Sequence, residues 1–247
     1  GQILTLLQPG KMITAGPPTL STGGAVSNTG LALFRLGIPT QLIGKIGRDP
    51  FGEAVCRVIN RFDPTLTSKM VVDPKSSTSY TVILSPPGLD RMFLHNPGAN
   101  ETFSPEDIDY SIVNQADLFH FGYPPVMREF YINEGAGLME MLRRVKAAGV
   151  TTSIDLTFPD PLSESSRIDW KEIFTATLPY TDIFAPSVGE LLFMLHRHTF
   201  EHLSAQGDLL GQVTPDLLYE LSEEILGLGA KIVMLKLGDC GAYLRTA

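Results

Sequence analysis

Helix-like and strand-like segments alternate from residue 23 to the end of the sequence. Parallel strands must be joined by long crossovers, and those crossovers are usually helices. The alternation therefore predicts a three-layer α/β/α fold with a mostly parallel sheet. Strands are expected at residues 40–46, 70–72, 117–121, 150–155, 182–185 and 231–237, and helices at 24–36, 50–62, 126–148, 169–177, 187–196 and 215–226, with a short helix starting at Ser104.

Two segments interrupt this alternation. Thr78–Leu84 and Arg91–Asn96 are predicted to form a hairpin with a long loop at residues 85–90, and residues 1–20 are rich in Pro and Gly. We assign residues 1–20 and about 73–100 to a small β lid beside the main sheet. Residues 1–247 are then expected to form a single domain.

The charge balance argues against nucleic acid or an anionic membrane as a partner. Nineteen Lys and Arg residues face 27 Asp and Glu residues, which gives a net charge of −8. The two cysteines, Cys56 and Cys240, form no CxxC motif, which favours a reducing compartment and a cytoplasmic location. No apolar run approaches the roughly 18 residues that a membrane span needs.

Glycine-rich segments occur at two predicted helix starts. Gly23 and Gly24 precede the first helix, and Asn28 lies one turn inside it, where its amide suits a ligand rich in hydroxyl groups. These glycines are also compatible with an ordinary tight turn. Residues 44–52 (GKIGRDPFG) join a strand to a helix, but the Walker pattern GxxxxGK[ST] is absent from the sequence.

Taken together, residues 23–37 (GGAVSNTGLALFRLG) and 42–52 (LIGKIGRDPFG) resemble the N-terminal signature of the ribokinase-like (PfkB) family of carbohydrate kinases. Residues 88–93 (GLDRMF), 96–100 (NPGAN) and 236–241 (KLGDCG) resemble the family's lid hairpin, the segment after it and the nucleotide loop. The resemblance implies a ribokinase-like fold and a sugar kinase that uses ATP and Mg²⁺.

The resemblance also implies roles for individual residues. The sugar site would include Gly23, Gly24, Asn28 and Arg91, the nucleotide site would include Ser187, Lys236, Gly238 and Gly241, and Glu190 would help to place magnesium. Lys45, Arg48 and Lys236 would supply local positive charge for ATP. A homodimer formed through the lid is a further expectation from the resemblance.

Several family features are absent or altered. The family's first-strand Asp has no counterpart here, and its Asn-x-x-Glu is Ser187-Val188-Gly189-Glu190. Its Asp-x-Asn-x-Arg is Asp155-Leu156-Thr157-Phe158-Pro159, so only the Asp matches. The family's Gly-Ala-Gly-Asp segment, which supplies the catalytic base, is also missing. We therefore expect an incomplete chain with no catalytic base among these residues, and the catalytic Asp beyond Ala247.

The same residues allow structural explanations. Ser187 and Glu190 form the S-x-x-E pattern of a capping box before an apolar run, so a helix cap and a magnesium-site role both stay open. Asp155 ends a predicted parallel strand, where ligands bind in open α/β sheets. His196, His198 and His202 suggest a metal site, but a solvated surface explains them better because zinc needs three or four converging ligands.

The expected function is ATP-dependent phosphorylation of a sugar hydroxyl. One alternative is a nucleoside kinase of the same fold, in which Tyr80 or Phe93 of the lid would stack on a base. Another is a catalytically silent, sugar-binding regulatory protein.

Overall fold

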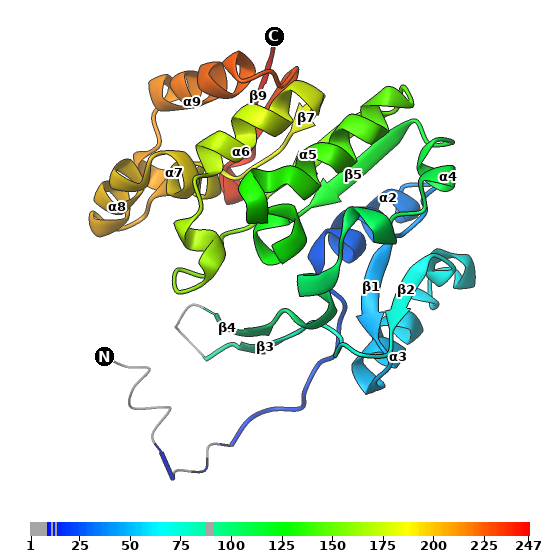
Figure 1. The fold of residues 1–247 in the computed structure, drawn as a ribbon. Helices are drawn as coiled ribbons and strands as arrows, with labels where there is room; N and C mark the ends of the chain where they lie inside the picture. Colours follow the sequence, from blue (N-terminus) through cyan, green and yellow to red (C-terminus); the bar gives the residue numbers. More distant parts are fainter. Residues whose placement is uncertain (1–8, 11, 13, 87–90) are drawn as a thin grey trace.

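The computed structural model describes residues 9, 10, 12, 14–86 and 91–247, and its main feature is a five-stranded sheet (Figure 1). The sheet has the order β5-β6-β7-β8-β9, with β5 to β8 parallel and β9 antiparallel to β8. The strands are β5 (Leu118–Gly122), β6 (Thr151–Asp155), β7 (Ile183–Phe184), β8 (Ile232–Lys236) and β9 (Ala242–Thr246).

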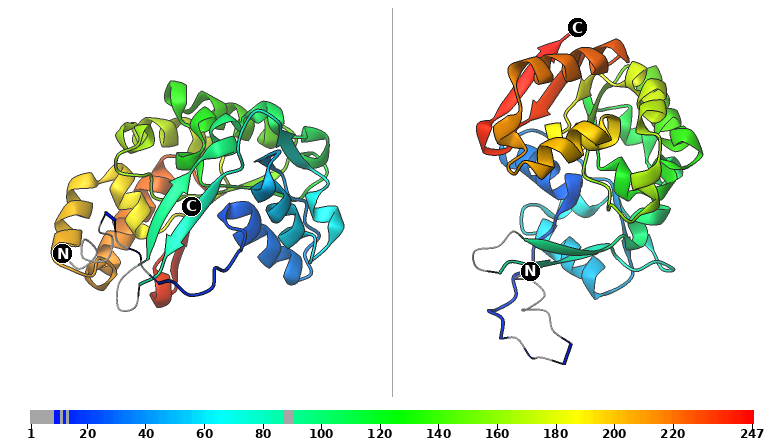
Figure 2. Two further views of the ribbon diagram at one scale, coloured as in Figure 1. Left: turned by 90° about the horizontal axis from the view of Figure 1, so that it is seen from below. Right: turned by 90° about the vertical axis from the view of Figure 1, so that its left-hand side faces the viewer.

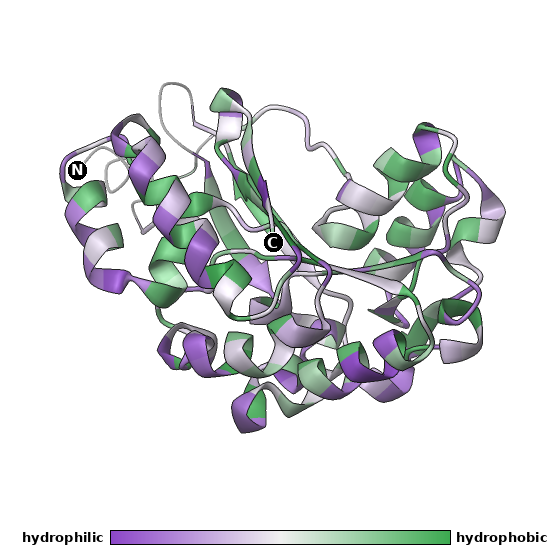
Figure 3. Cartoon of the chain, turned by 90° about the horizontal axis from the view of Figure 1, so that it is seen from above, coloured by the Kyte–Doolittle hydropathy of each residue, from purple (hydrophilic) through white to green (hydrophobic). Residues whose placement is uncertain are grey.

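Helices cover one face of this sheet. Phe121, Ile154, Phe184 and Val233 point into the largest hydrophobic cluster, together with residues of the helices between the strands. These helices carry hydrophobic and hydrophilic residues around their axes, as expected for elements with one buried side (Figure 3). They are α5 (Ile132–Ala147), α6 (Trp170–Thr177), α7 (Val188–Leu195), α8 (Arg197–Ala205) and α9 (Pro215–Gly227).

The N-terminal part has a second, smaller hydrophobic cluster, which consists of Leu31, Leu42, Ile59 and Leu66. It contains α2 (Leu31–Arg35), β1 (Gly44–Gly47), α3 (Pro50–Ile59) and β2 (Met70–Asp73), and α4 (Tyr110–Val113) follows later in the chain. β1 and β2 are parallel but form a separate two-stranded sheet. The central sheet is mostly parallel, as expected, but among the described residues it does not include β1 and β2; β1 contacts the short helical segment Gly98–Thr102.

The predicted hairpin is confirmed. β3 (Tyr80–Leu84) and β4 (Met92–Asn96) are antiparallel, with Tyr80 opposite Asn96. The hairpin lies on the side toward which the carboxyl ends of β1 and β5 point (Figures 1 and 2). Residues 14–22 contain no helix or strand, whereas residues 1–8, 11, 13 and 87–90, which include parts of the predicted lid and of its sequence motif, lie outside the described residues.

Two helices differ from the sequence prediction. The helix expected from residue 126 begins only at Ile132, after two short 3-10 segments at Pro124–Val126 and Arg128–Phe130. Its first turn is irregular, because Asn133, Glu134 and Gly135 have positive φ angles of 50°, 58° and 74°. The separate helix α8 was not predicted; it follows α7 after a break at His196, where the backbone leaves the helical region.

Candidate functional site

The carboxyl ends of the parallel strands carry a pair of opposite charges. Asp155 ends β6, and its carboxylate forms an ion pair with the ammonium group of Lys236, which ends β8. The backbone N–H of Leu156 donates to the same carboxylate oxygen at 2.8 Å. The Asp155 side chain is only 13% exposed, whereas Lys236 is 35% exposed and its charge reaches solvent. The sequence-based placement of Asp155 at a strand end is confirmed.

The N-terminus of α7 lies next to this ion pair. A parallel β-bridge joins Ser187 to Lys236, and the capping box is formed: the N–H of Ser187 donates to Glu190 at 2.7 Å, and the N–H of Glu190 donates to the Ser187 hydroxyl at 3.2 Å. Burial raises the pKa of the Glu190 carboxyl, opposed by the Ser187 N–H and the Lys236 charge. A helix N-terminus and a lysine therefore face the same edge, an arrangement that favours an anion.

A close backbone approach links the first helix to this edge. A Cβ atom on Gly122, at the end of β5, would lie 2.1 Å from the Cβ atom of Ala25. Gly122 also pairs with Asp155 across the sheet. The Gly23–Gly24 turn therefore lies at the same edge as Asp155. Gly24 has a φ angle of +73°, and among the described residues no atom beyond the chain neighbours lies within 4 Å of a Cβ added to either glycine, so the turn leaves space for a ligand.

Asn28, the predicted sugar ligand, is exposed in the first helical segment, whose residues Val26–Gly30 form a π-helical turn. Its amide therefore has room for a ligand. Arg91 lies elsewhere, on the hairpin, with its guanidinium 5.7 Å from the centre of the Phe93 ring. The structure thus brings the glycine turn, Asp155 and Lys236 together and leaves Arg91 on a separate element.

The predicted nucleotide loop directly follows Lys236. Residues Gly238–Cys240 form a tight turn between β8 and β9, and Gly238 and Gly241 have φ angles of +60° and +93°. Both angles lie in the region that glycine favours, and Gly241, with a ψ angle of −132°, adopts a conformation that other residues reach only with strain. A Cβ on Gly238 would lie 3.1 Å from Leu210, whereas the space around Gly241 is open.

His120, in β5, lies near the Asp155–Lys236 ion pair and was not singled out by any sequence motif. Its Nδ1 is 3.0 Å from the Ser153 hydroxyl, while Nε2 is buried and has no hydrogen-bond partner among the described residues. Burial lowers the pKa of His120, opposed by the Asp155 carboxylate. Because only the pairing of β5 with β6 brings these groups together, no local sequence signal reveals the contact.

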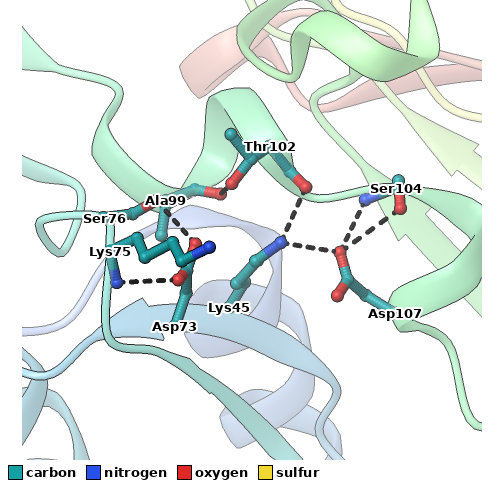
Figure 4. A network of polar contacts seen from close by, with 8 residues as sticks. All are labelled: Lys45, Asp73, Lys75, Ser76, Ala99, Thr102, Ser104 and Asp107. Carbon is teal, nitrogen blue, oxygen red and sulfur yellow. Dashed lines mark hydrogen bonds and ion pairs between the residues drawn. The ribbon is translucent and has the colours of Figure 1, made fainter.

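Lys45 forms an ion pair and a hydrogen bond with residues that follow the hairpin. Its ammonium donates to the carbonyl of Thr102 at 2.8 Å and to Asp107 at 3.0 Å, and its side chain is only 11% exposed (Figure 4). Asp107 also accepts the N–H of Ser104 at 3.0 Å, so it caps the short helix predicted there. The Lys45 charge links β1 to residues 102–107, and its expected role toward ATP stays a prediction.

Two negative findings concern metals and membranes. In the described part of the chain, no three His, Cys, Asp or Glu side chains converge as a metal site would require. His196 instead contacts Glu224 through Nε2 at 2.6 Å, and Nε2 of His202 contacts Gln206 at 2.7 Å. Among the described helices, none combines the length and the apolar character needed to cross a bilayer.

Comparison with known proteins agrees with the sequence motifs. The model of the family described as pfkB family carbohydrate kinase matches residues 4–247. A protein of Arabidopsis thaliana described as probable fructokinase-2 is 26% identical over 184 residues, which cover 74% of this chain and 55% of that protein. The chain thus spans about half the length of the curated relatives that it matches.

Solved structures agree on the fold. A PfkB protein from a Polaromonas species has a TM-score of 0.71 at 21% identity, covering 97% of this chain and 74% of the other. An Arabidopsis thaliana ribokinase solved with ribose and ATP has a TM-score of 0.68 at 20% identity, covering 97% and 68%. The ribokinase-like fold expected from the motifs is confirmed.

Proposed function

Because the chain belongs to the pfkB family of carbohydrate kinases, we propose that the protein transfers the γ-phosphoryl group of ATP to a hydroxyl group of a sugar. The observation that carries this proposal is the shared edge of the sheet: the open Gly23–Gly24 turn, the Asp155–Lys236 pair and the N-terminus of α7 meet there. A sugar bound at the glycine turn would therefore lie next to groups that favour an anion, as phosphoryl transfer requires.

In this proposal the glycine turn and Asn28 bind the sugar. Lys236, the Ser187 end of α7 and the turn containing Gly238 and Gly241 bind the phosphates of ATP. Lys236 leaves part of its charge in solvent, so it can exchange its contact with Asp155 for a phosphate oxygen. The hairpin β3–β4 closes over the sugar and excludes water.

Magnesium fits this edge when the phosphates supply most of its ligands. Mg²⁺ usually keeps several waters and binds one or two protein carboxylates together with substrate phosphates. Glu190 is the carboxylate that would help to hold it, because Lys236 already neutralises Asp155. The bound ion would neutralise charge on the transferred phosphoryl group. The capping role of Glu190 and a magnesium role are compatible.

The two alternatives predict different results in one experiment. ADP release by the native protein is measured with a panel of hexoses, pentoses and nucleosides. A sugar kinase releases ADP only with a sugar, a nucleoside kinase prefers nucleosides, and a silent binding protein binds sugar without releasing ADP. We also propose that the protein is cytoplasmic and that it binds neither nucleic acid nor membranes. It would form a homodimer through the hairpin.

A further inference from the structure

An open pocket of about 440 Å³ lies between the hairpin and the loop that follows β6. Aromatic rings, an imidazole, an amide and one carboxylate line it. The lining residues are Tyr80, Val82, Phe93, Leu94, His95, Asn96 and Asp160. Since Asp160 follows Asp155 by five positions, the pocket adjoins the loop that leaves the polar edge of the sheet.

Packing and local hydrogen bonds fix the loop that carries Asp160. The ring of Phe158 lies against Gly189, where a Cβ would approach it to 2.9 Å, and it makes an edge contact with Phe193 at 5.8 Å between ring centres. The N–H of Leu162 donates to the Asp160 carboxylate at 2.9 Å. The carboxylate is therefore held in place while its side chain stays exposed.

The pocket lining is negatively charged. It contains the Asp160 carboxylate but no lysine or arginine, and Asp160 forms no ion pair among the described residues. Burial lowers the pKa of His95, opposed by Asp160, so the imidazole adds little positive charge at neutral pH. The guanidinium of Arg91 lies over the Phe93 ring and does not line the pocket.

We propose that Asp160 makes this pocket select uncharged sugars and reject sugar acids and sugar phosphates. This inference rests on the proposed function and names its substrate class. A carboxylate accepts hydrogen bonds from two neighbouring hydroxyl groups of a sugar. Aromatic rings pack against the C–H face of such a ligand, whereas a carboxylate or phosphate on the ligand meets a like charge.

The test measures binding by calorimetry with two probes of similar size, neutral D-fructose and anionic D-gluconate. The wild-type protein is expected to bind fructose more tightly. Asp160→Asn keeps a hydrogen-bond acceptor for Leu162 but offers the sugar hydroxyls one acceptor fewer, so fructose binding should weaken somewhat. We expect the variant to raise the affinity for gluconate relative to that for fructose roughly three- to tenfold. The control Asp216→Asn removes the same charge from the exposed start of α9 and should change neither affinity.

Several results would overturn the inference: equal affinities for both probes, no binding of either, or an unchanged affinity ratio in Asp160→Asn. A second variant, Arg91→Gln, addresses the nearest arginine. If it lowers gluconate affinity by more than Asp160→Asn raises it, Arg91 sets the charge preference and the inference fails. Charge-selective binding without ADP release would uphold the inference and overturn the proposed kinase activity, so the two failures are distinguishable.

Discussion

A substitution of Asn28 should affect sugar binding without affecting the stability of the fold. Its side chain is exposed and makes no hydrogen bond in the described structure, so Asn28→Ala should change stability by less than about 0.5 kcal/mol. The loss of one hydrogen-bond partner for the sugar costs about 1–3 kcal/mol. We therefore expect sugar use to weaken roughly five- to 150-fold. Steady-state kinetics with varied sugar and varied ATP should show a lower kcat/KM for sugar and an unchanged KM for ATP. An unchanged kcat/KM for sugar would refute the assignment.

Lys236 is proposed to bind phosphate and also neutralises Asp155. Lys236→Met leaves a carboxylate that is 13% exposed without its cation, so the free energy of unfolding should fall by about 1–3 kcal/mol, measured by urea denaturation. A charged hydrogen bond to phosphate is worth about 1.5–3 kcal/mol, so the KM for ATP should rise roughly tenfold or more.

Lys171→Met is the matched control for this variant. Lys171 also pairs with a carboxylate, that of Glu224, but its side chain is 62% exposed and lies on α6. An exposed ion pair contributes about 0–1 kcal/mol. The control should leave the KM for ATP unchanged, and an equal effect of the two variants on ATP would remove Lys236 from the proposed nucleotide site.

At the scale of elements, Asp182 joins two strands to α5. Its carboxylate contacts Lys146 and Lys231, both at 2.7 Å, and accepts the N–H of Thr152 at 2.9 Å. Burial raises the pKa of Asp182, but the two lysines and Thr152 outweigh burial and hold the pKa well below its usual range. Because its pKa is lowered in the folded state, the Asp182 carboxylate stabilises the fold. This stabilisation is complete above the unfolded pKa, near 3.9, and is lost as the pH falls through the folded pKa.

Asp182→Asn should therefore lower the free energy of unfolding by about 1–3 kcal/mol at pH 7. The difference from wild type should shrink below about pH 4, where the wild-type protein loses the same contribution. Urea denaturation at several pH values measures it. A difference that stays constant from pH 7 to pH 3 would show that the charge of Asp182 is not what stabilises this junction.

The contact between β5 and the first helix permits an element-scale test of the sugar site. In Gly122→Ala the new Cβ would meet that of Ala25 at 2.1 Å, so the Gly23–Gly24 turn must shift away from β5. We expect the KM for sugar to rise while the KM for ATP changes little. Gly227→Ala, whose Cβ would meet nothing within 4 Å, is the control. A Gly122→Ala variant with native sugar kinetics would contradict the proposed position of the turn.

The sequence predicted elements with strong local signals and missed contacts that depend on tertiary packing. Asp49, for example, caps α3 through the N–H of Gly52 at 2.8 Å, and the helix predicted at residue 50 begins there. The Lys45–Asp107 pair joins residues far apart in the chain, so the glycine-rich motif around Lys45 does not reveal it. Asp160 belongs to none of the sequence motifs, and only the fold brings it next to the hairpin.

At the scale of the whole molecule, two hydrophobic clusters support different parts of the proposed site. The larger cluster fixes the ends of β5 to β8, and the smaller one supports the helix that carries Asn28. The close approach of Gly122 to Ala25 brings the proposed sugar and phosphate regions to one edge. The central claim is therefore that sugar and ATP react at this edge, which requires both to be bound together.

The most direct measurement is ADP release by the native protein in the presence of Mg²⁺ and one neutral sugar at a time, with mass spectrometry of the sugar product. The account predicts saturable, sugar-dependent ADP release and a product heavier by one phosphoryl group. Lys236→Met should raise the KM for ATP in this assay, and Asn28→Ala should weaken sugar use. ADP release that does not depend on sugar, or none with any sugar although sugar and ATP both bind, would contradict the account.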